Sequence, residues 1–357
     1  MRNNDESANL DFLRAYAVLT VYFGHLLQTF HIERIFGPVT IYDLGQTGVL
    51  IFFVHTSLVL MLSLARLRVT GRTLFTAFYI RRAFRIYPLS IVTLLVMLVV
   101  HAPDFSNHVY SWPGWQAVLS NLALVQNLTG SPSYPAVLWS LPYEVQMYIV
   151  LPLLFVFLRR FPSWWVPVCL WILDVAAILL MLKLRVREIP ALLQYTPCFL
   201  AGIIGYRLWS VARMDLRFWG WPIVITSCLA LRVLAEATAI RYATTLSPWF
   251  VCLFLGCAVP QFRELGRGWV RTFAAMMAKY SYGIYLSHSI VFWIAFILLK
   301  GTPFWLQGGA CLALSVLLPL AMYHGIEKPM ISLGVDFAGA SAKHALASEL
   351  APRRTTA

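Results

Sequence analysis

Long apolar runs separated by short polar segments recur along the whole chain. Each run has 17 to 23 residues. A helix needs about 20 residues to cross a hydrocarbon core that is roughly 30 Å thick. The pattern therefore predicts an all-α polytopic membrane bundle of about ten transmembrane helices. The runs cover residues 10–28, 45–64, 86–102, 137–158, 164–182, 191–209, 218–236, 244–260, 281–299 and 303–325.

The polar segments between these runs indicate the orientation. With a cytoplasmic N-terminus, 20 of the 28 Lys and Arg residues fall on the cytoplasmic side, seven fall outside, and Arg14 lies within the first run. Basic residues are enriched in cytoplasmic loops, so we expect both termini in the cytoplasm. Asp5 and Glu6 precede the first run where a cleavable signal would have a basic leader, so this run is expected to remain as the first helix.

The longest loop, residues 103–136, carries no Lys or Arg and is predicted to be external. Its polar side chains can meet a polar acceptor. Alternatively, its tryptophans can form an aromatic cap at the membrane interface, and the sequence leaves both readings open. The residues concerned are Asp104, Asn107 and Asn121, and Trp112 and Trp115.

Composition excludes a soluble domain. Of 357 residues, 60% are apolar and 12% are charged, about half the charged fraction of ordinary globular proteins. The net charge of +13 would suggest nucleic acid for a soluble protein. In a membrane protein it indicates contact with anionic lipid, so no nucleic-acid partner is expected. The six cysteines lie in apolar runs without Cys-x-x-Cys spacing, which indicates neither disulfides nor a metal site.

Ionisable residues inside the apolar runs are the first site candidates, because their burial in a bilayer is costly. Arg14 and His25 are eleven residues apart in the first run, which corresponds to about three helical turns and about 16 Å. Both side chains are therefore expected on one stripe, with the cation near the cytoplasmic end and the imidazole in the outer half.

A histidine in this position can be an interhelical hydrogen-bonding residue or a group that moves a proton near neutral pH. Glu144 begins the fourth run at a depth comparable to that of His25. A carboxylate there can support an imidazolium, as in a catalytic dyad, or it can be a favourable acid at a helix N-terminus.

Arg82 and Arg85 are one helical turn apart ahead of the third run. Two guanidinium groups on one face suit phosphate oxygens, and Arg14 is expected at a similar depth. The alternative is a basic anchor on anionic headgroups.

Together these segments resemble the acyltransferase 3 family of integral membrane O-acyltransferases. Five ordered motifs across residues 8–334 carry the resemblance. They are Leu10 to Leu19 with His25, Arg82 and Arg85 before Tyr87-Pro88, Trp139 to Glu144, Ser281 to Leu286 with His288, and Ile326 to Pro329. Helix 2 departs from the family pattern, because His55 and Ser57 stand where many members have an apolar residue and glycine.

The resemblance implies transfer of an acyl group, usually acetyl, from cytoplasmic acyl-CoA to a hydroxyl of a carbohydrate or lipid-linked acceptor at the cell (inner) membrane. Arg82 and Arg85, with Arg14, would bind the CoA phosphates. His25 would act as general base or acyl carrier, supported by Glu144, and no metal is implied. The acceptor stays open among lipopolysaccharide, capsule, lipid-linked glycan and macrolide.

The expected organisation is one membrane domain over residues 1–334 and a disordered cytoplasmic tail over 335–357. The chain would be the form without a fused extracytoplasmic hydrolase-like domain. A secondary transporter that uses the intramembrane His, Arg and Glu as a relay is the alternative from another class, although no repeated halves are recognisable.

Overall fold

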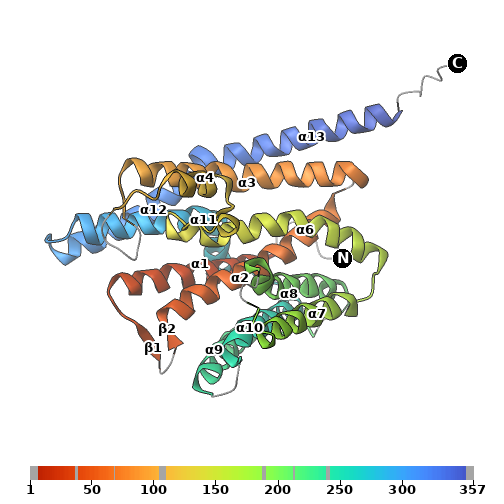
Figure 1. Cartoon of the computed structure of the whole chain (residues 1–357), viewed down its shortest axis with the longest axis horizontal. Helices are drawn as coiled ribbons and strands as arrows, with labels where there is room; N and C mark the ends of the chain where they lie inside the picture. Colours follow the sequence, from red (N-terminus) through yellow and green to blue (C-terminus); the bar gives the residue numbers. More distant parts are fainter. Residues whose placement is uncertain are drawn as a thin grey trace.

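A computed structural model describes residues 7–36, 39–67, 69–103, 110–186, 190–211, 214–238 and 242–350. Over these residues the chain is a bundle of long helices with one two-stranded hairpin (Figure 1). Nine of the described helical segments are long and apolar enough to cross a membrane. A tenth helix, α8 (Ala191–Val211), has 21 residues and packs against α2 and α10. The predicted all-α polytopic fold is confirmed.

The elements follow one another in a simple order. They are α1 (Ala8–Thr29), β1 (Arg34–Phe36), β2 (Val39–Thr40), α2 (Ile41–Arg66), α3 (Gly71–Val99), α4 (Trp115–Ala123), α5 (Gln126–Thr129), η1 (Ala136–Ser140), α6 (Leu141–Arg160), α7 (Trp165–Lys183), α8, α9 (Gly220–Ala237), α10 (Ala243–Ala258), η2 (Val259–Gln261), α11 (Trp269–Phe292), η3 (Trp293–Leu298), α12 (Phe304–Met322), η4 (Tyr323–Glu327) and α13 (Lys328–Leu350). The strands β1 and β2 form an antiparallel hairpin.

Two helices extend well beyond the apolar runs that predicted them. Helix α3 begins at Gly71 and not near residue 86, and α11 begins at Trp269 and not near residue 281. Hydropathy marks only the part of a helix that lies among apolar surroundings, whereas backbone hydrogen bonding continues through polar turns. Arg82 and Arg85 therefore lie in the interior of α3.

The C-terminal segment also differs from its prediction. Helix α13 continues to Leu350, so residues 335–350 of the expected disordered tail are helical. The first part of α13 packs along α3, where the rings of Phe84 and Phe337 lie 5.6 Å apart and a side chain at Gly334 would meet Phe84. Figure 1 shows the two helices side by side along the top of the view. Residues 351–357 lie outside the described residues.

Helices α1 and α2 cross at unusually short range because small residues face each other. A Cβ atom built on Gly24 would lie 3.2 Å from the backbone of Gly45. A Cβ atom on Gly48 would lie 2.7 Å from the Val21 side chain and 2.8 Å from the carbonyl oxygen of Ala17. Close approach of this kind is typical of helix contacts in membranes, where small residues allow backbones to touch.

Helix α1 packs against α2 and α11, and α7, α8, α9 and α10 lie together at the bottom of Figure 1, where α8 and α10 contact α2. Ser7 caps α1, since its side chain accepts a hydrogen bond from the Leu10 amide. A capping box of Thr40 and Asp43 starts α2. These contacts fix the starts of the two helices that carry Arg14, His25 and His55.

Candidate functional site

A cavity of about 100 Å³ lies between α1, α2, α3, α6 and α11. Its wall is unusual for a membrane bundle, because it contains three arginines, one glutamate, one histidine and three tyrosines. Apolar side chains from α2, α3 and α6 complete it. The polar residues of the wall are Arg14, His55, Thr56, Arg82, Arg85, Ser140, Glu144, Tyr148, Ser281, Tyr282 and Tyr285.

The structure brings the three predicted arginines together. Arg82 and Arg85 are one turn apart on α3, and Arg14 reaches the same cavity from α1. Within the described part of the chain, the buried Nε atoms of Arg14 and Arg82 have no hydrogen-bond partner. Buried polar groups are nearly always hydrogen-bonded, so these N–H donors are suited to an anionic ligand.

Arg85 differs from the other two arginines because it already has an anionic partner. It forms an ion pair with Glu327, whose side chain is fully buried at the end of η4. The guanidinium carbon also lies 5.6 Å from the centre of the Tyr282 ring. Glu327 belongs to the closing motif recognised in the sequence, which gave no indication that this carboxylate contacts Arg85.

Glu144 lies in the arginine cavity, in the first turn of α6. Its Oε2 accepts a hydrogen bond of 3.0 Å from Tyr148, and the carboxylate interacts electrostatically with all three arginines. The prediction paired Glu144 with His25. Its described contacts instead connect it with the arginines, because α6 enters the bundle beside α3.

His25 is hydrogen-bonded to another histidine. Its Nδ1 lies 2.8 Å from Nε2 of His288 on α11, and the two imidazole rings are parallel at a centroid distance of 4.9 Å. Arg14, eleven residues earlier on α1, lines the cavity, and on α11 the wall residue Tyr285 precedes His288 by one turn. The histidine pair therefore lies next to the cavity, beyond Tyr285. The sequence singled out His288 as a motif residue without assigning it a role.

Tyr285 separates the cavity from the histidine pair. Its hydroxyl donates a hydrogen bond of 2.6 Å to the carbonyl oxygen of Val137 and lies 2.8 Å from Oγ of Ser140. Its ring centre is 6.0 Å from that of His288. The cavity and the imidazole pair are thus neighbours on either side of Tyr285, and we call the polar residues from the three arginines to the two histidines the polar path.

The two unusual residues of α2 have different environments. His55 is buried, lines the cavity and lies in the electrostatic neighbourhood of Arg14. Ser57 is also buried, but its hydroxyl donates hydrogen bonds to the carbonyl oxygens of Phe53 and Val54 on its own helix. His55 therefore adds a polar group to the cavity, whereas Ser57 is part of the helix packing.

In the loop predicted to be external, for which acceptor contact and an aromatic cap were both left open, Asn121 has a structural role. The side-chain nitrogen of Asn121 donates hydrogen bonds to the carbonyl oxygens of Ala117 and Pro132. Its side-chain oxygen accepts one from the backbone amide of Tyr134. Trp112 and Trp115 are exposed and lie edge to face. Asp104 and Asn107 lie outside the described residues.

Comparison with known proteins identifies the family. The family model for the acyltransferase domain, acyltransferase 3, matches residues 7–324, which include all five arginine, glutamate and histidine residues predicted for the site. The chain is 26% identical over 320 residues to Acyltransferase MdmB of Streptomyces mycarofaciens, covering 79% of this chain and 78% of that protein. No solved structure matches the chain significantly. This multi-pass membrane protein belongs to the acyltransferase 3 family.

Proposed function

We propose that this acyltransferase moves an acyl group, in the first instance acetyl, from acyl-CoA on the cytoplasmic side to a hydroxyl of a carbohydrate or lipid-linked acceptor on the outer side. One observation carries the proposal. Three arginines from α1 and α3 converge on a single cavity, and two of them have buried N–H groups without hydrogen-bond partners among the described residues.

The chemistry of the donor fits this cavity. Acyl-CoA carries phosphate groups at one end and a thioester at the end of a thin pantetheine arm. Arginine recognises phosphate through paired, charge-assisted hydrogen bonds, which are stronger than neutral ones. Tyr285, which lines the cavity, is also the neighbour of the histidine pair, and a volume of about 100 Å³ suits the phosphates and the start of the thin arm and not the bulky nucleoside.

His25 is the group proposed to carry out the transfer. As a general base it takes the proton of the acceptor hydroxyl, whose oxygen attacks the thioester carbonyl. The carbon–sulfur bond breaks, and the proton returns to the CoA sulfur. As an acyl carrier, His25 attacks the thioester first and is then deacylated by the acceptor. In either route the imidazole lies between donor and acceptor.

Glu144 is proposed to act at the donor end. Its interactions with Tyr148 and the three arginines support a role in keeping the guanidinium groups close together and oriented. A carboxylate among arginines offsets part of their mutual repulsion. We therefore expect Glu144 to influence donor binding more than proton transfer.

The proposed sidedness rests on the distribution of basic residues. In Figure 1, α1 begins and α13 ends toward the same side of the bundle, as an even number of crossings requires. The excess of Lys and Arg on that side supports a cytoplasmic location for both termini.

Reconstitution tests this function. Purified protein in sealed vesicles, with native membrane material as the source of acceptor, should release CoA thiol from acetyl-CoA added on the side of the termini. His25→Ala should abolish the release, whereas the exposed His324→Ala should not. Activity only from the opposite face would contradict the proposed sidedness. Mass spectrometry of envelope glycans from cells with and without the gene would then identify an acceptor by the mass of one acetyl group.

A further inference from the structure

The contact between His25 and His288 joins two distant parts of the chain. His25 lies on α1 and His288 on α11, and the nitrogen atoms Nδ1 and Nε2 that face each other are 2.8 Å apart. His288 is 1% exposed, whereas His25 is half-buried. His25 is thus the more exposed partner of the pair, and His288 is enclosed by protein.

The surroundings of His288 determine where its proton lies. Its Nδ1 is 3.2 Å from the carbonyl oxygen of Ile284, and a carbonyl oxygen can only accept a hydrogen bond. Nδ1 of His288 therefore carries the hydrogen, which leaves Nε2 of the neutral ring as an acceptor. Since Nε2 accepts, the facing Nδ1 of His25 must donate.

This assignment sets the tautomer of His25. With its hydrogen on Nδ1, the neutral ring has its lone pair on Nε2. That atom faces the start of α2, where a Cβ atom on Gly45 would lie 3.8 Å from it. A Cβ atom there would be in ordinary van der Waals contact with the ring, so Nε2 lies against the first turns of α2 on the side of the ring away from His288.

Aromatic rings hold His288 in place. The centres of the Tyr22, Tyr285 and Phe292 rings lie 5.8 to 6.4 Å from that of His288. Tyr22 is itself fixed by a hydrogen bond of 2.6 Å to Ser315 on α12. Side chains packed in this way keep one rotamer, which preserves the direction of the Nε2 acceptor.

We propose that His288 is the positioning residue of His25, and that it selects the tautomer in which Nε2 of His25 accepts the proton of the acceptor hydroxyl. The proposal rests on the role given to His25 under the proposed function. When the acceptor oxygen bonds to the acyl carbon and the carbon–sulfur bond breaks, Nε2 takes the proton and later gives it to the CoA sulfur. Nδ1–H of His25 stays hydrogen-bonded to neutral His288 throughout.

A neutral imidazole here fills the place that a carboxylate has in a catalytic triad. It orients the base in the same way but adds no negative charge to a site that must accept a charged donor beside it. The polar path then has its anion-binding groups at the arginine end and its proton-transfer groups at the histidine end, joined by α1 and α11.

Two substitutions at His288 separate positioning from packing. In His288→Gln, the amide oxygen can occupy the place of Nε2 and accept from His25. In His288→Asn, the shorter amide can keep the contact with the Ile284 carbonyl oxygen but does not reach His25. We expect His288→Asn to lower kcat at least 100-fold with the donor KM changed less than threefold, and His288→Gln to stay within about tenfold of the wild type.

The measurement is CoA thiol release from acetyl-CoA by the full chain in vesicles, with native membrane material as acceptor source. Melting temperatures in detergent establish that each variant is folded. The same substitutions are made in a His25→Ala background, where His288→Asn should cause no further loss. If His288→Asn fails to fold, His288→Met takes its place in the comparison with His288→Gln, because methionine has no strong acceptor where Nε2 lies.

The outcomes distinguish the inference from the function on which it rests. No thiol release by the wild type, or full release by His25→Ala, would overturn the proposed function itself. With an active wild type and an inactive His25→Ala, equal kcat values for His288→Gln and His288→Asn would overturn the positioning role. The positioning role would also be overturned if a rise in donor KM accounted for the whole loss of thiol release in His288→Asn.

Discussion

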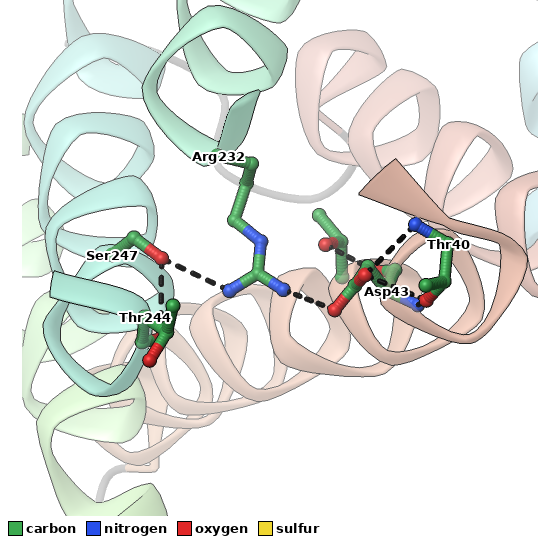
Figure 2. Close-up of polar contacts among 6 residues, drawn as sticks. Thr40, Asp43, Arg232, Thr244 and Ser247 are labelled. Carbon is green, nitrogen blue, oxygen red and sulfur yellow. Dashed lines mark hydrogen bonds and ion pairs between the residues drawn. The ribbon is translucent and has the colours of Figure 1, made fainter. Parts of the chain in front are cut away.

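The Arg232 guanidinium lies 2.6 Å from Oδ1 of Asp43 and 3.0 Å from Oγ of Ser247, so that one side chain from α9 connects the starts of α2 and α10. Figure 2 shows this arrangement, in which Asp43 also accepts hydrogen bonds from Thr40. Both charged side chains are largely buried. The contact fixes the beginning of α2 just ahead of Gly45, which faces His25.

This ion pair gives the first prediction, which concerns stability. Arg232→Met leaves the carboxylate of Asp43 buried without its cation, and removal of one partner of a buried pair typically costs about 3–5 kcal/mol. The melting temperature in detergent should fall clearly. The double variant with Asp43→Asn should recover part of the loss, and the exposed Arg217→Met is the matched control. A double variant that is less stable than either single one would contradict this account.

The second prediction concerns the close contact of α1 with α2. Gly48→Ala places a methyl group within 2.7 Å of the Val21 side chain and 2.8 Å of the Ala17 carbonyl oxygen, so the helices must move apart. Overpacking of this kind typically costs about 1–3 kcal/mol. We expect a lower melting temperature and a lower kcat, because α1 carries both Arg14 and His25. Gly308→Ala on α12, where a methyl group has open space, should change neither.

The third prediction concerns the donor site. A charge-assisted hydrogen bond contributes about 1.5–3 kcal/mol, so Arg82→Ala should raise the KM for acetyl-CoA roughly ten- to a hundredfold while the acceptor KM changes little. Arg82→Lys should restore only part of the affinity, because lysine lacks the planar fork. The exposed Arg160→Ala serves as control. Full rescue by lysine would indicate a lipid anchor.

The fourth prediction separates the two ends of the polar path. Glu144→Gln keeps an oxygen for the Tyr148 hydroxyl but removes the charge that offsets the arginines. We expect a change in the KM for acetyl-CoA that exceeds the change in kcat. Tyr148→Phe, which removes only the hydroxyl donor, should have a smaller effect in the same direction. A Glu144→Gln enzyme with a normal donor KM and a kcat as low as that of His25→Ala would place Glu144 with the imidazole after all.

Most of the fold follows from the sequence because membrane crossing is encoded locally. About 20 consecutive apolar residues are sufficient to predict a span, and each of the ten predicted runs falls largely within described helices. The polar extensions of α3 and α11 were not predictable from hydropathy, since their turns are held by backbone hydrogen bonds and not by apolar character.

The residues proposed for the site could be named from the sequence, but the contacts between them could not. Arg82 and Arg85 are neighbours through helix geometry, so their spacing was enough to place them on one face. His25 and His288 are 263 residues apart, and Arg85 and Glu327 are 242 apart. Such contacts depend on which helices pack together, a property for which a single sequence contains no local signal. The pairing of Glu144 with His25 was proposed from depth alone and lacked this information.

Helix α1 runs without interruption through all 22 of its residues, and this continuity fixes the distance between residues along it. Eleven residues separate Arg14 from His25, so their backbones are held about 16 Å apart whatever the surrounding loops do. A donor whose phosphates bind the arginines must have a pantetheine arm long enough to span that distance, so that its thioester reaches the imidazole of His25. Under the proposed function, the protein then selects acyl donors by the length of the arm as well as by the charge of the phosphates. A short thioester without the phosphate-bearing end cannot contact the arginines and His25 at the same time.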